Sequence, residues 1–276
     1  MMSRMLEVSV SGYYAWQDRP LSKHDREEIR LELEIKAAHK RTRQTYGPER
    51  LQCDLAKYGV IAGICRIKRI RKKLGLHCKQ KKKYKVTTDS KHKLPVASNL
   101  LNQQFMVDKP NMAWVSDITY VHTDEGWLYL AGHKDLFTHE IVGYSLGERM
   151  TQELVRESLL RAVETKCPSA GLMHHSDRGS QYCSYEYRQL LERFAMRASM
   201  SGKGNCYDNA PMESFWGMLK QELIYQSHFR NRYEARQAIT EYIELFYNRQ
   251  RVQSSLGFMT PAAFAQKYYS ELLVAA

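Results

Sequence analysis

The sequence predicts a mixed α/β sheet with flanking helices, preceded by an all-α, helix-turn-helix-like region. Three observations support this division. The chain has 276 residues, and at about 150 residues per domain this length suggests two domains. Residues 1–100 hold 24 basic and 10 acidic side chains, a net charge of +14, whereas residues 101–276 hold 18 and 20, a net charge of −2. Near Phe105 the pattern also changes from helical spacing to runs of β-branched and aromatic residues.

The composition excludes several classes of protein. Hydrophobic residues make up 43% of the chain, enough for sizeable cores and too many for global disorder. No apolar run approaches the roughly 18 residues that span a bilayer, and the first ten residues lack a secretory leader pattern. The six cysteines are scattered, which disfavours a zinc knuckle or a redox motif and fits reduced thiols. We therefore expect a cytoplasmic, nucleoid-associated protein with no membrane partner.

The front region, residues 1–100, is predicted to contain three helices and a basic linker. The first helix runs from His24 to Arg41, with apolar residues at every fourth position (Ile29, Leu33 and Ala37). The second runs from about residue 49 to 58 and ends at Gly59, because glycine accepts the left-handed cap; its inward side chains are Leu51 and Leu55. The third runs to about residue 74, with an apolar stripe of Ile64, Ile67, Ile70 and Leu74.

The second and third helices, joined by a tight turn, are typical of a helix-turn-helix. The alternative is an ordinary helical hairpin with a basic exterior. Six cations on one short helix repel each other unless phosphates lie nearby, so we predict DNA contacts from Arg66, Lys68, Arg69, Arg71, Lys72 and Lys73. The Lys-rich stretch over residues 79–93 is predicted to be a flexible linker that contacts phosphates without reading sequence.

The back region, residues 105–270, is predicted to hold the sheet. Its order is three strands in hairpin-like succession (113–122, 127–136 and 140–148), then a helix capped by Thr151, a strand over 171–176, a helix over 185–194 and a strand over 198–201. A Gly-rich loop over 202–209 then leads to a helix that starts at Pro211, because proline suits the first helical position. This order predicts a mixed sheet with helices packed on it.

Three carboxylates in this region are candidate catalytic groups. Asp117 lies inside an apolar strand on the face of Val115 and Thr119, where an ionised carboxylate is costly to bury without compensation. Asp177 ends a second strand, at the edge where α/β sheets place functional groups. Glu213 lies in the first turn of the helix opened by Pro211. Taken singly, they could be a strand-edge residue, a turn former and a favourable helix-start charge.

Together, the two aspartates at adjacent strand ends and the glutamate form an oxygen-only ligand set that suits Mg²⁺ or Mn²⁺. Two such ions, roughly 4 Å apart, can activate an attacking oxygen and stabilise the leaving oxygen of a phosphodiester. Asp177 is the expected bridging ligand, because it lies between the other two in the chain. On the glutamate helix, Asn209, Glu213 and Lys220 fall on roughly one stripe. We predict that Asn209 and Lys220 contact DNA, the alternative for Lys220 being a solvated surface charge.

These motifs carry a resemblance to a known family. WVSDITY at 114–120, HHSDRGSQY at 174–182 and GKGNCYDNAPMESFWGMLK at 202–220 are similar to the three catalytic blocks of insertion-sequence transposases with a retroviral-integrase core. The 35 residues between Asp177 and Glu213 match the Asp-Asp-35-Glu class. YNRQRVQSSLGFMTPAAF at 247–264 resembles the C-terminal block, and VSVSGYYAW at 8–16 and RTRQTYGPERLQCDLAKYGV at 41–60 resemble the N-terminal segment. Gln253 and Tyr207 depart from the pattern, where histidine and tryptophan are expected.

The resemblance implies a ribonuclease-H-like core and Mg²⁺-dependent DNA strand transfer, with Asp117, Asp177 and Glu213 as the metal-binding triad. It implies double-stranded DNA as partner, both element ends and target, and a homo-oligomer on that DNA. The chain resembles a downstream reading-frame product that is fused to, or assembles with, an upstream-frame protein. The leading hypothesis is therefore a transposase. The alternatives are a catalytically limited DNA-binding protein that regulates a longer fused transposase, and a structure-selective nuclease with the same core.

Overall fold

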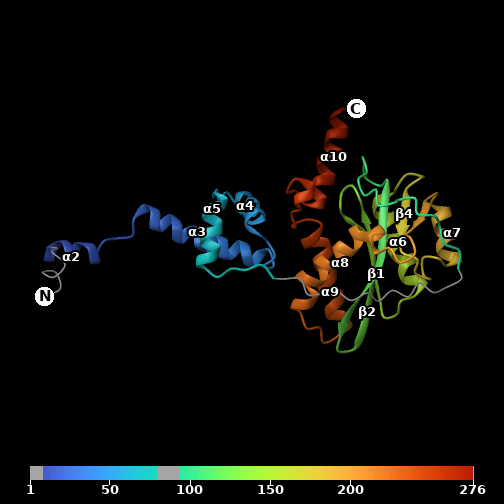
Figure 1. Cartoon of the computed structure of the whole chain (residues 1–276), viewed down its shortest axis with the longest axis horizontal. Helices are drawn as coiled ribbons and strands as arrows, with labels where there is room; N and C mark the ends of the chain where they lie inside the picture. Colours follow the sequence, from blue (N-terminus) through green and yellow to red (C-terminus); the bar gives the residue numbers. More distant parts are fainter. Residues whose placement is uncertain (1–8, 80–93, 276) are drawn as a thin grey trace. The chain divides into compact units, whose positions relative to one another are not determined.

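A computed structural model describes residues 9–79 and 94–275 of the chain, in two compact units, Met1–Cys78 and Lys79–Ala276. Figure 1 shows both units. The predicted linker over residues 79–93 lies, apart from Lys79, outside the described residues. No helix in the described part of the chain is long and apolar enough to cross a membrane.

The first unit is all helical, as predicted. Its elements are α2 (Val10–Gln17), α3 (Lys23–Arg41), α4 (Pro48–Lys57) and α5 (Ile64–Lys73). Their common core consists of fully buried side chains from three helices, namely Ile35, Leu51, Leu55, Ile67 and Ile70. Gly59 follows α4 with a positive φ of 75°, the left-handed conformation expected of it.

The apolar stripe predicted for α3 is wrong. Ile29 and Leu33 are exposed, and the helix buries Leu31, Ile35 and Ala38 instead. Positions exactly four apart drift around a helix that turns every 3.6 residues, whereas steps of four and three stay on one face. The buried set follows the second spacing.

The second unit is built on one five-stranded mixed sheet with the order β3-β2-β1-β4-β5. Its strands are β1 (Ala113–Thr123), β2 (Gly126–Asp135), β3 (Ile141–Gly147), β4 (Met173–Ser176) and β5 (Arg197–Met200). The first three form an antiparallel meander, and β4 and β5 join in parallel on the other side of β1. This confirms the predicted mixed α/β, ribonuclease-H-like class.

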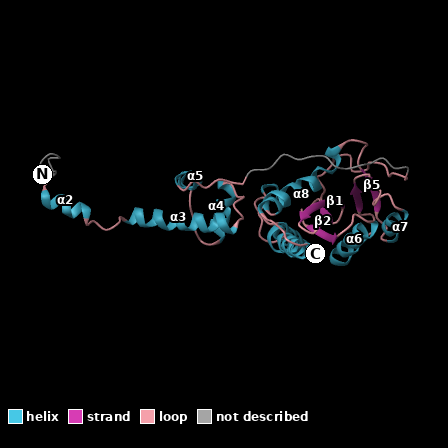
Figure 2. Cartoon of the chain, turned by 90° about the horizontal axis from the view of Figure 1, so that it is seen from below, coloured by secondary structure: helices cyan, strands magenta, loops and turns pink. Residues whose placement is uncertain are grey.

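Helices cover both faces of the sheet, so β1 separates two cores (Figures 1 and 2). On one face, α6 (Gln152–Lys166) and α7 (Tyr185–Arg193) pack against Trp114. On the other, α8 (Ala210–Glu222) and α9 (Arg232–Glu241) pack against Val115. Alternate residues of β1 therefore enter different cores, as the period of a strand requires.

The C-terminal part completes the second face. Its elements are η1 (Cys206–Asn209) before α8, η2 (Ile224–Gln226), the π-helix η3 (Tyr242–Tyr247), η4 (Ser254–Leu256) and α10 (Pro261–Ala275). A buried ion pair joins the segment between η3 and η4 to the end of α8. Arg251 contacts Glu222, the last residue of α8, with Nη2 at 2.8 Å from Oε1, and Tyr242 donates its hydroxyl to the same carboxylate at 2.7 Å.

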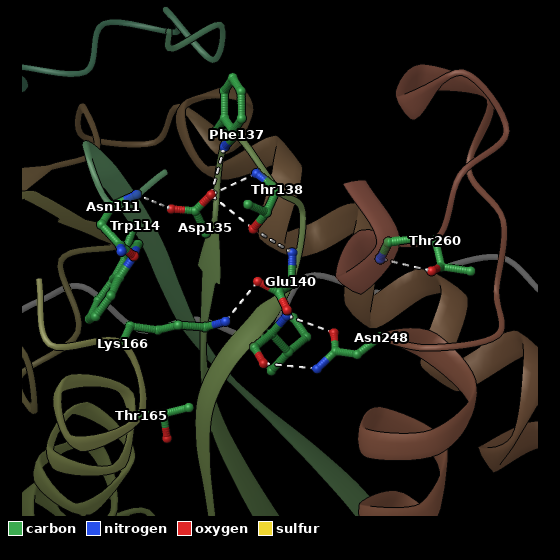
Figure 3. A network of polar contacts seen from close by, with 12 residues as sticks. Asn111, Trp114, Asp135, Phe137, Thr138, Glu140, Thr165, Lys166, Asn248 and Thr260 are labelled. Carbon is green, nitrogen blue, oxygen red and sulfur yellow. Dashed lines mark hydrogen bonds and ion pairs between the residues drawn. The ribbon is translucent and has the colours of Figure 1, made fainter. Parts of the chain in front are cut away.

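A polar network fixes the end of β2 and the start of β3 (Figure 3). The Asp135 carboxylate accepts hydrogen bonds from the backbone N–H groups of Asn111 and Thr138 at 2.8 and 2.7 Å. The amide of Asn248, just past η3, accepts from the N–H of Ile141 and donates to its carbonyl, at 3.0 and 3.1 Å. These bonds satisfy backbone groups at the edge strand and tie β3 to the C-terminal helices.

Candidate active site

The parallel pairing of β1 and β4 brings the two aspartates side by side. Ser116 on β1 is in register with Ser176 on β4, so the next residues along the two strands are Asp117 and Asp177. The β4 strand ends at Ser176, and the Asp177 carboxylate accepts a 2.8 Å hydrogen bond from the N–H of Gly179 in the following turn. The expectation of two strand ends holds only for Asp177, because β1 continues to Thr123.

The third carboxylate comes from α8, whose start is fixed to the sheet by two groups. The Asp208 carboxylate fixes the Gly-rich loop by accepting hydrogen bonds from the N–H of Gly202 at 2.6 Å and from the side-chain amide of Asn99 at 2.9 Å. Asn209 donates its amide to the carbonyl of Ser116 at 3.1 Å. The Asn209 side chain is therefore turned into the protein, with 4% of the residue exposed, and it docks the start of α8 beside Asp117. Glu213 follows one turn later as an exposed side chain.

Trp216 is a site residue that sequence reasoning missed. Its indole Nε1 donates to Oδ2 of Asp117 at 3.1 Å. The ring fits because Gly132, opposite Asp117 in the β1–β2 register, has no side chain. A Cβ built on Gly132 would lie 3.1 Å from the Trp216 ring and 2.9 Å from Met212. The available signal was the tryptophan one turn after Glu213, on the face that meets the sheet.

The three carboxylates interact electrostatically around Asp117. Burial, followed by the charges of Asp177 and Glu213, raises the pKa of Asp117 well above its usual range, although the hydrogen bonds from the Ile118 N–H and Trp216 act in the opposite direction. Partial burial raises the pKa of Glu213. The charges of both other carboxylates therefore act on Asp117. The sequence instead predicts Asp177 as the central, bridging ligand.

The donor set fits a divalent cation. All three groups are carboxylates, the ligands that Mg²⁺ and Mn²⁺ prefer, and the charge crowding at Asp117 is what a bound cation relieves. Within residues 9–79 and 94–275, no group of three or more His, Cys, Asp or Glu side chains is already arranged to hold an ion.

Lys220 lies on the same side as the triad, as its predicted stripe on α8 implies. Its Nζ is 5.2 Å from the centre of the Tyr120 ring, a cation–π contact. Burial lowers the pKa of Lys220, and the Asp117 charge acts in the opposite direction. The lysine is therefore half-buried beside Asp117 rather than a fully solvated charge.

A buried polar network behind the aspartates also went unpredicted. Nε2 of His174 on β4 lies 2.9 Å from the Tyr187 hydroxyl, 3.1 Å from the Ser116 hydroxyl and 3.3 Å from Nδ1 of His133. Burial lowers the pKa of His133 to about 3 and that of His174 well below its usual range, so both rings are neutral. The network joins β1, β2, β4 and α7 one residue before Asp117 on β1. Its signal was a set of polar residues at inward strand positions.

In the first unit, carboxylates compensate part of the basic helix α5. Glu28 on α3 pairs with Arg69 at 2.7 Å and with Arg66 at 3.4 Å, and Glu32 pairs with Lys73 at 2.5 Å. The expectation that only nearby phosphates relieve the repulsion among the cations of α5 is therefore wrong, because carboxylates of α3 offset part of their charge. Arg71 donates to the Cys78 thiol at 3.3 Å. Lys68 and Lys72 are exposed and, within the described residues, form no ion pair.

The two departures from the family pattern lie in different environments. Gln253 is buried, and its Oε1 lies 3.1 Å from Nδ1 of His139, so it occupies a structural position in the C-terminal block. Tyr207 is 71% exposed in the loop before α8.

Comparison with known proteins yields consistent matches. Residues 107–206 and 213–268 match two family models described as integrase core domain, and residues 24–84 match an HTH-like domain. The Insertion element IS600 uncharacterized 31 kDa protein of Shigella sonnei is 57% identical over 268 residues, which cover 97% of this chain and 98% of that protein. The Transposase InsF for insertion sequence IS3A of Escherichia coli strain K12 is 39% identical, over 96% of this chain and 93% of that protein. A simian T-cell lymphotropic virus intasome structure in complex with PP2A regulatory subunit B56 gamma has a TM-score of 0.48 at 21% identity, covering 78% of this chain and 70% of that chain.

Proposed function

This chain belongs to the insertion-sequence transposases with an integrase core domain, and from this membership we propose that it cuts DNA at element ends and joins them to target DNA. The reaction is a divalent-metal-dependent attack on a phosphodiester, first by water and then by a 3′-hydroxyl. Asp117, Asp177 and Glu213 are the proposed metal-binding catalytic residues. The observation that carries the proposal is the convergence of three carboxylates from β1, β4 and α8, with both others acting on the pKa of Asp117.

The chemistry that two bound Mg²⁺ or Mn²⁺ ions supply is activation of the attacking oxygen together with stabilisation of the leaving oxygen. The chain's own groups set the geometry. Trp216 and the Ile118 N–H each donate to one Asp117 oxygen, at 3.1 and 2.8 Å, and these two bonds orient the carboxylate. Lys220, half-buried beside Asp117, holds a DNA phosphate close to the carboxylates. No side chain forms a covalent bond to DNA.

The basic first unit supplies most of the phosphate contacts in this proposal. Double-stranded DNA is the partner, both as element end and as target, and the active assembly is a homo-oligomer on DNA, alone or with an upstream-frame protein. The HTH-like match over residues 24–84 and the exposed lysines of α5 support a DNA-binding role for this unit.

Joining of a labelled 3′-end oligonucleotide to plasmid DNA in Mg²⁺ tests the proposal. Glu213→Gln removes one charge with almost no change of shape. We expect the rate of joining to fall by about three orders of magnitude or more, because activation of the attacking oxygen and stabilisation of the leaving oxygen are lost together. Glu192→Gln on α7, also an exposed helical glutamate, is the matched control and should keep full activity.

The outcomes separate the competing functions. Joining that depends on Glu213 supports the transposase, nicking without joining indicates a nuclease, and DNA binding with neither reaction indicates a regulator. A folded Glu213→Gln variant with wild-type joining would remove Glu213 from the catalytic set.

A further inference from the structure

A pocket of about 420 Å³ lies at the tip of the β1–β2 hairpin. It is formed by the tips of both strands, the end of α8 and the segment after it, and its lining includes Tyr120, His122, Trp127, Lys220, Ser227 and Phe229. The pocket forms where β1 continues beyond β4: the last β1 residue paired to β4 is Ser116. From Asp117 onward, this edge of β1 pairs with no other strand in the described part of the chain.

Trp127 gives this pocket an aromatic wall. It is 46% exposed, and two rings of β1 meet it nearly at right angles, Tyr120 at 5.0 Å between centroids and His122 at 5.1 Å. These edge contacts hold the indole in place while almost half of its surface stays open. A fixed, half-exposed aromatic ring beside a cation is the arrangement on which proteins stack an unpaired base.

Lys220 connects the pocket to the carboxylates. Its ammonium contacts the Tyr120 ring at 5.2 Å and is close enough to Asp117 to respond to its charge. Asp117 and Tyr120 are three residues apart on one strand, about 10 Å at 3.3 Å per residue. A stacked DNA strand advances 3.4 Å of helix axis per phosphate and an unstacked strand advances further, so this separation is spanned by at most about three nucleotides.

The remaining charges at the rim fit a nucleotide. Oδ1 of Asp124 lies 3.0 Å from Nε2 of His228, so this carboxylate at the rim has a partner within the protein. Lys220 brings a positive charge to this pocket beside Tyr120, and the exposed part of Trp127 gives a base a surface to stack on. A paired base inside the duplex is covered on both faces by its neighbours, so it must leave the stack to reach such a wall.

We propose that this pocket binds one unpaired base of the DNA strand whose phosphate lies at Lys220, within about three nucleotides of the scissile bond. The site rests on the proposed function, because it assigns a subsite to the same DNA substrate. It gives the protein a preference for DNA ends that are already frayed, since opening a paired end costs unstacking free energy.

The test uses the full chain, without divalent metal, and duplex oligonucleotides with either a fully paired end or three unpaired nucleotides. The unpaired segment carries the fluorescent base 2-aminopurine. We expect its fluorescence to be quenched on binding and the unpaired end to bind more tightly than the paired end. Trp127→Ala should abolish the quenching and reduce the preference for the unpaired end by about tenfold, within the range measured for loss of one base–aromatic stack.

Two further variants separate stacking from folding. Trp127→Phe keeps an aromatic wall and should restore much of the preference. Ser227→Leu fills part of the pocket from the exposed segment after α8 without adding or removing any aromatic group, and it should reduce quenching. The matched control is Tyr185→Ala, an aromatic residue on α7 that is 63% exposed and should change neither readout.

Quenching that survives Trp127→Ala, or equal affinity of the wild-type chain for paired and unpaired ends, would overturn the proposal. These measurements report DNA binding and no reaction, so their result does not depend on whether the proposed joining reaction is correct. Joining that depends on Glu213 alongside absent quenching rejects only the subsite. Quenching that depends on Trp127 alongside joining that is unaffected by Glu213→Gln rejects only the triad.

Discussion

At the scale of single residues, the ionised form of Asp117 is disfavoured in the folded chain. It is half-buried, and both other carboxylates of the site act on it. The structure tolerates this because Trp216 and the Ile118 N–H each donate a hydrogen bond to it, at 3.1 and 2.8 Å. Two donors offset part of the desolvation, and the raised pKa shows that they do not offset all of it.

We predict that Asp117→Asn stabilises the metal-free chain at neutral pH. The folded carboxyl keeps its proton to higher pH than the unfolded one, whose ordinary pKa is 3.8. The unfolded chain therefore binds fewer protons in this interval, and stability falls as pH rises from about 4 through the raised pKa. Asparagine does not ionise, so the gain in stability from Asp117→Asn should grow over the same pH interval. Each 1 kcal/mol recovered raises Tm by about 2–4 °C for a chain of this size class.

The measurement is the difference in Tm between wild type and Asp117→Asn, without metal, from pH 4 to pH 8. Taking the difference removes the pH-dependent contributions that both proteins share. These come from the buried histidines and from Asp135, whose pKa is also raised by burial. Mg²⁺ should stabilise the wild type more than the variant. A difference that stays constant with pH would show that Asp117 is already ionised at acid pH and carries no such cost.

At the scale of elements, most of the second unit is predictable from sequence because its strands are short runs of β-branched and aromatic residues between turn residues. The start of α8 follows from Pro211, and Thr151 precedes α6 as expected. Strand pairing is not predictable in this way, because no local sequence pattern shows that the pairing of β1 with β4 ends at Ser116 while β1 continues. The open edge, the Trp127 pocket and the Gly132–Trp216 fit all depend on that pairing. The phase of the α3 stripe failed for a related reason, because helix packing selects which apolar residues are buried.

The contact between α8 and the C-terminal block depends on one buried ion pair, and we predict a large cost for breaking it. The Glu222 and Arg251 side chains are 5% and 4% exposed, and the Glu222 charge raises the pKa of Arg251 against the effect of burial. Arg251→Met leaves a buried carboxylate with only the Tyr242 hydroxyl, and the free energy of unfolding should fall by about 3–5 kcal/mol. Glu222→Gln combined with Arg251→Met should recover part of this loss.

Urea denaturation of the single and double variants measures these changes. The exposed pair Lys267–Glu271 on α10, 3.7 Å apart, is the comparison, and Lys267→Met should change stability by less than about 1 kcal/mol. If Arg251→Met were no more harmful than Lys267→Met, the buried pair would not hold the C-terminal block to α8.

At the scale of the whole molecule, charge and chemistry lie in different parts of the chain. All of the net +14 lies within residues 1–93, because residues 94–100 carry no charge, whereas the part with the carboxylates is slightly acidic. Residues 99–101 also belong structurally with the core, since Asn99 bonds to Asp208 and the Leu101 N–H to the Ser199 hydroxyl at 3.1 Å. A cut after residue 93 therefore separates the charge from the core without removing these bonds.

We predict that a chain lacking residues 1–93 binds DNA more weakly and with a much flatter dependence on salt. Each lost phosphate contact lowers the slope of log affinity against log salt by about 0.9. In the full chain, replacing both Lys68 and Lys72 with glutamine should lower the slope by about 2 if each contacts one phosphate. Lys267→Gln, exposed on α10, is the control and should leave the slope unchanged. Affinities measured from 50 to 200 mM salt decide the matter, and an unchanged slope after the deletion would place the phosphate contacts in the core.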